Sequence, residues 1–233
     1  NKPGFISYSG AFHGRTSGAV ALTDSPKIIA PCNSREDFHI LPWGDLVATE
    51  AVLKSDTIAG IIIEGIQGVG GIQVPSAEFL KGIAALAKKY NAKLILDEVQ
   101  SGFGRTGRFF AHQWVDGIMP DLISMAKGMG NGYPIGGILI SPDFKSNYGM
   151  LGTTFGGNHL ACAASLAVLE VLESEKLIPN AALLGTRLMK ELKDIPGITD
   201  VRGIGLMVGI DLDRDAGTVL TELVQNNHIF TGS

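Results

Sequence analysis

The feature that most restricts the fold of this chain is a continuous apolar run at residues 58–64, Ile-Ala-Gly-Ile-Ile-Ile-Glu. A strand with one face in water alternates apolar and polar residues, whereas a strand of a parallel sheet is covered on both faces and is apolar throughout. A second run, at residues 93–100, has the same character, and helical spacing of apolar residues opens at Pro75-Ser76 between the two runs. Strand, helix and strand form a βαβ unit, so the sequence predicts an α/β fold with a mostly parallel sheet.

The other segments extend this pattern to both ends of the chain. Further short strands are predicted at residues 5–8, 27–31, 121–124 and 137–140, and further helices at 45–53, 158–173, 178–193 and 217–227. Residues 201–211 alternate small and apolar residues, which predicts one long or two short strands of a smaller domain. We therefore expect part of a large domain at 1–174 and part of an α+β C-terminal domain at 175–233.

Composition excludes several classes of function. The net charge of −4 and a pI near 5.7 give no electrostatic support for nucleic-acid binding. No apolar run is long enough to span a membrane, and no signal-peptide pattern opens the chain. Cys32 and Cys162 lie far apart and lack metal-ligand spacing, which indicates reduced thiols in a cytoplasmic protein without a metal site.

A glycine-rich loop at residues 127–137 carries the most distinctive candidate for chemistry. The mainly apolar segment 122–126 leads directly into Lys127. A lysine amine that loses water loses proton affinity and becomes nucleophilic, which is what Schiff-base chemistry requires. The same residues also fit a strand end followed by a surface turn with a solvated lysine.

Three predicted strands end in polar residues: Glu64, then Asp97 with Gln100, then Lys127. Ligands of open parallel sheets bind beyond the carboxyl ends of the strands, so we expect these side chains to gather at one edge. A buried aspartate can hold a protonated ring nitrogen, and a nearby lysine can form an imine. Together they fit pyridoxal 5′-phosphate. Without that context, Asp97 would also fit a helix cap or a turn.

Four sequence blocks then carry a resemblance to a known family. They are, in order, residues 12–16 (Phe-His-Gly-Arg-Thr), 96–107 (Leu-Asp-Glu-Val-Gln-Ser-Gly-Phe-Gly-Arg-Thr-Gly), 126–128 (Ala-Lys-Gly) and 154–158 (Thr-Phe-Gly-Gly-Asn). Over essentially its whole length the chain resembles the class III, fold type I pyridoxal-phosphate aminotransferases, most closely their acetylornithine and succinylornithine group. The resemblance implies the fold type I architecture, in which helices cover both faces of the large-domain sheet.

The resemblance implies six cofactor-binding residues, namely Phe12, Asp97, Val99, Gln100, Lys127 and Thr154. Lys127 would hold pyridoxal phosphate as a Schiff base and move the proton of the substrate carbon. Asp97 would keep the pyridine nitrogen protonated, and Gln100 would hydrogen-bond near the phenolic oxygen. Val99 would pack on one face of the ring, and Phe12 would cover the other.

The substrate and the partner subunit are implied in the same way. Arg15 would bind a substrate carboxylate through its planar guanidinium, with Thr153 and Glu64 as further substrate-binding residues. Thr154 would reach the phosphate of the neighbouring subunit, so the active unit would be a homodimer. His13, next to Phe12, is expected to pack and to hydrogen-bond to backbone.

The sequence also departs from the family pattern. Gly65 and Val69 stand where the family usually has a proline and a second glutamate, and His159 stands where it usually has a proline. In some members that glutamate pairs with a C-terminal arginine during substrate exchange. The family's phosphate loop and that arginine fall outside residues 1–233, so we expect a fragment lacking both ends and, alone, a poor enzyme.

These features predict an aminotransferase that moves the terminal amino group of an N-acylated ornithine to 2-oxoglutarate in arginine biosynthesis. An ornithine or 4-aminobutyrate aminotransferase, or a glutamate semialdehyde aminomutase, would use the same cofactor. A non-catalytic relic of the fold is a further alternative, but it has no physical reason to keep both Lys127 and Asp97.

Overall fold

The computed structural model describes residues 2–232 and contains a six-stranded sheet in the order β2-β1-β3-β4-β5-β6. The strands are β1 (Gly4–Tyr8), β2 (Phe38–Leu41), β3 (Ile58–Glu64), β4 (Lys93–Asp97), β5 (Leu122–Met125) and β6 (Gly137–Ile140). All neighbouring pairs are parallel except β5 and β6. The 126–136 connection carries no crossover helix of the kind that parallel pairing needs, so β6 returns antiparallel. The predicted mostly parallel α/β fold is thus confirmed.

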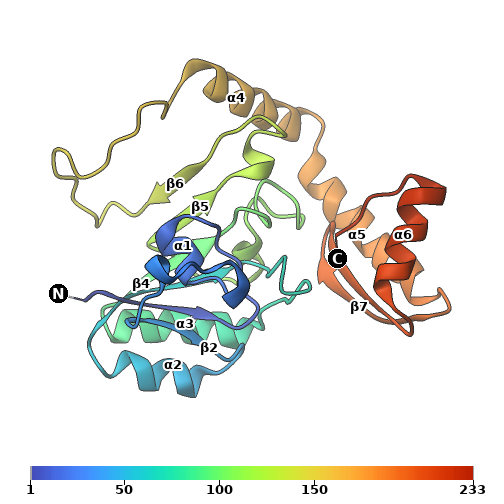
Figure 1. Cartoon of the computed structure of the whole chain (residues 1–233). Coiled ribbons are helices and arrows are strands. Elements are labelled where there is room, and N and C mark those ends of the chain that lie inside the picture. The colour runs from blue at the N-terminus through green and yellow to red at the C-terminus, as the bar shows by residue number, and fades with distance from the viewer. Residues whose placement is uncertain (1, 233) are drawn as a thin grey trace.

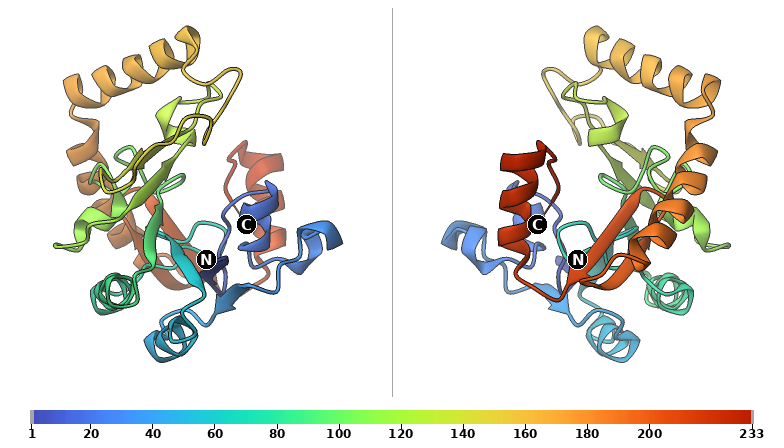
Figure 2. Two further views of the ribbon diagram at one scale, coloured as in Figure 1. Left: turned by 90° about the vertical axis from the view of Figure 1, so that its left-hand side faces the viewer. Right: turned by 90° about the vertical axis from the view of Figure 1, so that its right-hand side faces the viewer.

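Two helices, α2 (Leu46–Leu53) and α3 (Ala77–Lys89), lie side by side against one face of the sheet (Figures 1 and 2). Each begins at a side-chain cap. The Asp45 carboxylate accepts a hydrogen bond from Ala48 N at 2.8 Å, and the Ser76 hydroxyl accepts one from Phe79 N at 3.1 Å. Such caps satisfy backbone donors that the first helical turn leaves free.

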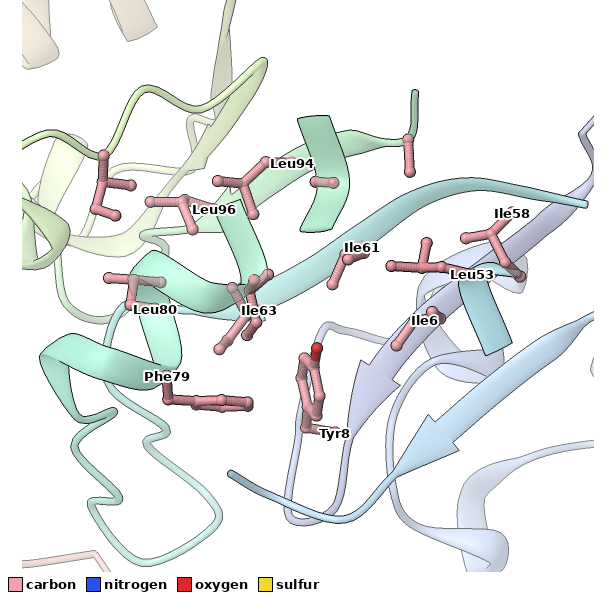
Figure 3. Close-up of a cluster of buried hydrophobic side chains, with 14 residues drawn as sticks. Ile6, Tyr8, Leu53, Ile58, Ile61, Ile63, Phe79, Leu80, Leu94 and Leu96 are labelled. Carbon is pink, nitrogen blue, oxygen red and sulfur yellow. The ribbon is translucent and has the colours of Figure 1, made fainter. Parts of the chain in front are cut away.

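The main core lies between these helices and the sheet. Tyr8 of β1 packs edge-on against Phe79 of α3, with ring centroids 5.1 Å apart (Figure 3). The buried Tyr8 hydroxyl lies 3.1 Å from Thr49 Oγ1, and burial raises the pKa of Tyr8 above its ordinary value. The remaining buried residues of this cluster are Ile6, Leu53, Ile58, Ile61, Ile63, Leu80, Ile83, Ala87, Ala92, Leu94, Leu96 and Ile118.

Two local predictions differ from the structure. Residues 27–31 do not form a strand: they span the end of one 3₁₀ turn, Pro26–Ile28, and the start of another, Pro31–Asn33, with an irregular link between them. Proline fixes φ near −65° and lacks an N–H for a ladder, so the prolines that open these turns work against a strand. Strand β2 was not predicted, because its half-buried sequence Phe-His-Ile-Leu lacks a continuous apolar run.

The C-terminal region contains α4 (His159–Ser174), α5 (Leu177–Lys193), β7 (Ile198–Ile204), β8 (Met207–Leu212) and α6 (Ala216–Asn227). The two strands form an antiparallel hairpin beside the main sheet (Figure 1). The predicted boundary at 174–175 falls between α4 and α5. The hairpin contacts both loops that follow β3 and β4: Arg202 Nε donates to Gly71 O at 2.7 Å, and Leu206 N donates to Arg105 O at 2.9 Å. Within residues 2–232, none of the helices combines the length and apolar character needed to cross a membrane.

Candidate functional site

The candidate site begins with one row of residues across three neighbouring strands. Glu64 at the end of β3 is the register partner of Asp97 at the end of β4, and Asp97 is the register partner of Ser124 on β5. Register partners project from the same face of a sheet. We call these three residues, two carboxylates and one serine, the carboxylate row.

Asp97 is the most firmly held member of the row. It is 6% exposed. Its Oδ1 accepts hydrogen bonds from Val99 N at 3.1 Å and from Ser124 Oγ at 3.2 Å, and its Oδ2 lies 2.8 Å from Nδ1 of His13. A carboxylate oxygen accepts about two hydrogen bonds. Oδ2 therefore has room for one further donor.

His13 has a larger role in the site than the sequence suggested. Its backbone N donates to Thr23 Oγ1, but its imidazole, with the side chain 1% exposed, pairs with Asp97. Its Nε2 is buried and has no hydrogen-bond partner within residues 2–232. The signal was in the topology: the loop after β1 opens at the same sheet edge as the ends of β3 and β4.

Glu64 is buried, and both of its carboxylate oxygens accept backbone hydrogen bonds. Oε1 accepts from Phe12 N and Oε2 from Gly68 N, both at 3.0 Å. Burial raises the pKa of Glu64, and the two backbone donors partly offset that rise. The carboxylate thus fixes the loops that carry Phe12 and Gly68, and its predicted substrate contact stays a prediction.

Lys127 lies directly after β5, at the start of a 3₁₀ turn, Lys127–Met129. The residue is exposed, yet desolvation lowers the pKa of its amine, and the charges of Asp97 and Glu64 offset part of that drop. Its φ is +43°, a left-handed conformation that costs a non-glycine residue energy. Such strain is typical of functional positions whose surroundings hold them in place.

The other predicted cofactor residues lie around the row. Phe12 is half-buried, and its backbone is tied to Glu64. Val99 is half-buried, and its N–H holds Asp97. The Gln100 side chain packs so closely over Gly68 that a Cβ there would lie 2.5 Å from Gln100 Nε2. The structure therefore brings Phe12, Asp97, Val99, Gln100 and Lys127 to one edge of the sheet.

Three predicted residues are not joined to this group. Arg15, Thr153 and Thr154 are all exposed, and within residues 2–232 no hydrogen bond or ion pair connects them to the carboxylate row. Thr153 Oγ1 accepts a hydrogen bond from Gly156 N at 3.2 Å, which makes a local turn. Thr154 lies in the exposed connection between β6 and α4, away from the carboxyl ends of the strands.

The residues at this edge fit pyridoxal phosphate. An amine with lowered proton affinity matches its aldehyde, and the free position on Asp97 Oδ2 matches a protonated ring nitrogen. The carboxylate is already held by backbone and hydroxyl donors, so it keeps its place whether or not a ring is bound. Phe12 and Val99 supply apolar surface beside it.

Comparison with known proteins identifies the relatives of this chain. The sequence pattern of a family described as aminotransferase class III matches residues 1–230. An acetylornithine aminotransferase of Bordetella parapertussis is 41% identical over 94% of this chain and 58% of its own length. An ornithine aminotransferase of Bacillus cereus is 43% identical over 88% of this chain and 53% of its own. The chain thus spans less than two thirds of the length of these curated relatives.

Solved structures show the same likeness. An ornithine aminotransferase from Toxoplasma gondii superposes with a TM-score of 0.90 at 31% identity, covering 100% of this chain and 57% of that one. In that protein pyridoxal phosphate partly occupies the active site. A thermostable (S)-enantioselective omega-transaminase from Thermomicrobium roseum has a TM-score of 0.81 at 32% identity, covering 93% of this chain and 55% of its own.

Proposed function

This chain belongs to the class III aminotransferases, a pyridoxal-phosphate-dependent family, and on that premise we propose which reaction the whole protein performs. It transfers the terminal amino group of an N-acylated ornithine, acetyl or succinyl, to 2-oxoglutarate, as a step of arginine biosynthesis. The acetylornithine aminotransferases among its relatives support this substrate, as does the Phe-His-Gly-Arg-Thr block at residues 12–16.

The observation that carries the proposal is the relation between Lys127 and Asp97. The amine has a lowered pKa and lies within reach of the charge of a buried carboxylate on the adjacent strand. An amine with lowered proton affinity beside a buried carboxylate is the combination that Schiff-base chemistry with pyridoxal phosphate needs. A group that exchanges protons near neutral pH needs a proton affinity matched to that pH.

When bound, pyridoxal phosphate supplies an aldehyde that condenses with amines and a ring that withdraws electrons from the substrate carbon. Lys127 Nζ would be the amine that holds it and, once free, would move the proton of the substrate carbon to the carbon that was the cofactor's aldehyde. Asp97 Oδ2 would hold the proton on the ring nitrogen, while Val99 N, Ser124 Oγ and His13 hold Asp97. Gln100 would hydrogen-bond near the phenolic oxygen, and Phe12 and Val99 would exclude water from the ring.

Substrate choice rests on groups at the open side of the site. We propose that Arg15 binds a substrate carboxylate, with Thr153 and Glu64 as further contacts. Val69 is 61% exposed and uncharged, so it cannot provide the carboxylate that some relatives use to neutralise a C-terminal arginine. The ornithine aminotransferases among the relatives make ornithine the second candidate donor.

We propose that the protein is a homodimer whose partner completes the site through Thr154. The exposed large apolar residues of β6, the following connection and α4 support this. They are Ile138, Leu139, Ile140, Phe144, Tyr148, Met150, Leu151, Phe155, Leu160, Leu166, Leu169 and Val171. Apolar surface gathered in this way is a mark of protein–protein contact. Sedimentation equilibrium should give twice the chain mass, and Leu166→Asp should shift it toward the monomer.

The experiment that tests the function compares four amino donors with 2-oxoglutarate and pyridoxal phosphate in the full-length protein. The donors are acetylornithine, succinylornithine, ornithine and 4-aminobutyrate, and glutamate formation is the readout. One of the two acylated ornithines should be the fastest. Fastest turnover of 4-aminobutyrate would refute the proposed substrate, and the absence of glutamate with every donor would favour the non-catalytic relic.

We also propose a cytoplasmic location, with which the two unpaired cysteines are compatible. A fluorescent fusion of the full-length protein should show it.

A further inference from the structure

The most fully hydrogen-bonded carboxylate of this site is Glu98, which directly follows Asp97. Its side chain is fully buried. Its Oε1 accepts from the backbone N of His112 at 3.0 Å and lies 2.9 Å from His112 Nδ1. Its Oε2 accepts from Ser101 Oγ at 2.6 Å and from Ala111 N at 3.0 Å.

Glu98 differs from Asp97 in how its acceptor positions are used. Two donors on each oxygen fill the capacity of a carboxylate. Asp97 keeps one position for a further donor, whereas Glu98 has none for a ligand. Its four partners all come from the loop 98–112, so the carboxylate fixes that loop at both of its ends.

The same carboxylate also reaches the segment that follows Glu64. A Cβ built on Gly65 would lie 2.9 Å from Glu98 Oε1 and 2.9 Å from Ser101 Oγ, so only glycine fits here without movement. The end of β3 is thus packed directly against the Glu98 cluster, which we define as Glu98, Ser101 and His112.

The loop held by the Glu98 cluster supports the third strand end as well. Phe103, two residues after Ser101, packs beneath the turn of Lys127: a Cβ on Gly128 would lie 3.2 Å from Phe103 Cβ. Phe103 is itself buried and packs against Phe109 at a centroid distance of 5.1 Å. The cluster therefore contacts, or supports through one residue, the segments that carry Glu64, Asp97 and Lys127.

We propose that Glu98 is a positioning residue that sets the relative placement of Lys127, Asp97 and Glu64. The proposal rests on the function proposed above, because it concerns the separation between the reactive amine and the carboxylate that faces it. Small errors in such a separation are costly to catalysis even when the fold survives. Glu98 itself touches neither cofactor nor substrate.

Three variants test the proposal in the full-length protein. Glu98→Gln keeps the shape of the side chain, but its amide NH2 then faces N–H or O–H groups that are themselves donors. Ser101→Ala removes one of the donors to Glu98 and is the milder change. Thr49→Val is the matched control, since it removes a buried hydrogen bond to Tyr8 in the core that α2 and α3 cover, outside the Glu98 cluster. Backbone hydrogen exchange is measured without cofactor, and imine formation with pyridoxal phosphate is followed by absorbance.

Relative to wild type, Glu98→Gln should speed exchange about tenfold in residues 64–71, 98–112 and 127–130, and Ser101→Ala by a few-fold, with α2 unchanged. Both variants should slow imine formation at Lys127 in the same order. If Glu98→Gln does not fold, Ser101→Ala decides the question. Faster exchange confined to residues 98–112, or no faster than in Thr49→Val, would overturn the proposal. A wild-type protein that forms no imine would instead count against the proposed function, and the exchange data would still decide the role of Glu98.

Discussion

The two sides of the candidate site differ in how far the chain itself fixes them. On the closed side, the side chains of Glu64, Asp97 and His13 are almost fully buried, and each of the four carboxylate oxygens has a hydrogen-bond partner. On the open side, Lys127 and Arg15 are exposed and make no ion pair within residues 2–232.

This difference follows from what each side has to do. A group that must present a fixed charge to a developing transition state works best when it is immobilised beforehand. An amine that attaches and detaches, or a guanidinium that grips successive substrates, must be free to move. The closed side is therefore built by folding, and the open side is completed by its ligands.

The largest effect is expected at Lys127, on the open side. Lys127→Ala and Lys127→Gly should each lower turnover by at least about 10⁴-fold, because the proton carrier at the substrate carbon is lost. The two variants should differ in stability. Glycine relieves the strain at φ +43°. The free energy of unfolding of Lys127→Gly should therefore be about 1 kcal/mol higher than that of Lys127→Ala. Equal denaturant midpoints would show that the backbone at Lys127 is not strained.

The next largest effect is expected at Asp97, on the closed side. Asp97→Asn can still accept from Val99 and Ser124 but cannot hold a proton on a ring nitrogen, so turnover should fall about 10²- to 10³-fold with little loss of stability. Asp121→Asn is the control. Asp121 pairs with Lys93 at the opposite end of the same strands, 2.8 Å away. Its substitution should lower stability and leave turnover unchanged, and similar turnover in both variants would refute the role of Asp97.

A smaller effect is expected at Arg15. Lysine keeps the charge but loses the planar fork, so Arg15→Lys should raise KM about tenfold and leave kcat nearly unchanged. The comparison is with an amino donor that lacks the remote carboxylate. If wild type and variant differ as much on that donor, Arg15 does not bind the carboxylate.

The smallest effect concerns the pH dependence of Glu64. Burial raises its folded-state pKa above the ordinary 4.5, so the folded state binds this proton more tightly than the unfolded state. Its contribution to stability is complete below pH 4.5 and declines as the pH rises through the folded-state pKa. The unfolding free energy of wild type minus that of Glu64→Gln should therefore fall between acidic and neutral pH. A difference that grows with pH would mean that the two backbone donors outweigh burial.

The sequence predicted the two carboxylates of the closed side and, on the open side, the position of Lys127. Apolar runs located β3 and β4, and the rule that parallel strands end at one edge brought Glu64, Asp97 and Lys127 together. The predicted helix starts near Asp45, Ser76 and Asn158 depend only on neighbouring residues, and in the structure each of these side chains caps its helix. All of these signals lie within one element or one topological rule.

What the sequence did not predict depends on contacts between distant residues. His13 and Asp97 are 84 positions apart, and nothing near His13 indicates whether its ring meets backbone or a carboxylate. In the sequence nothing distinguishes Glu98 from the other acidic residues, because its hydrogen bonds form only when the loop 98–112 folds back on it. The sequence left the exposure of Lys127 open, because a strand end gives no information on how far the following turn carries the side chain.

The carboxylate row limits where this protein can accept insertions and deletions. Because side chains alternate with a period of two, sliding β4 by one residue against β3 would turn Asp97 to the other face of the sheet, away from both Glu64 and Ser124. A strand cannot shift by less than one residue, so no smaller change of register between β3 and β4 keeps Asp97 beside Glu64. Insertions and deletions should therefore be excluded from residues 58–64, 93–97 and 122–125, while exposed connections without a proposed role, such as 34–36, are free to change length, since no rung of the ladder depends on them.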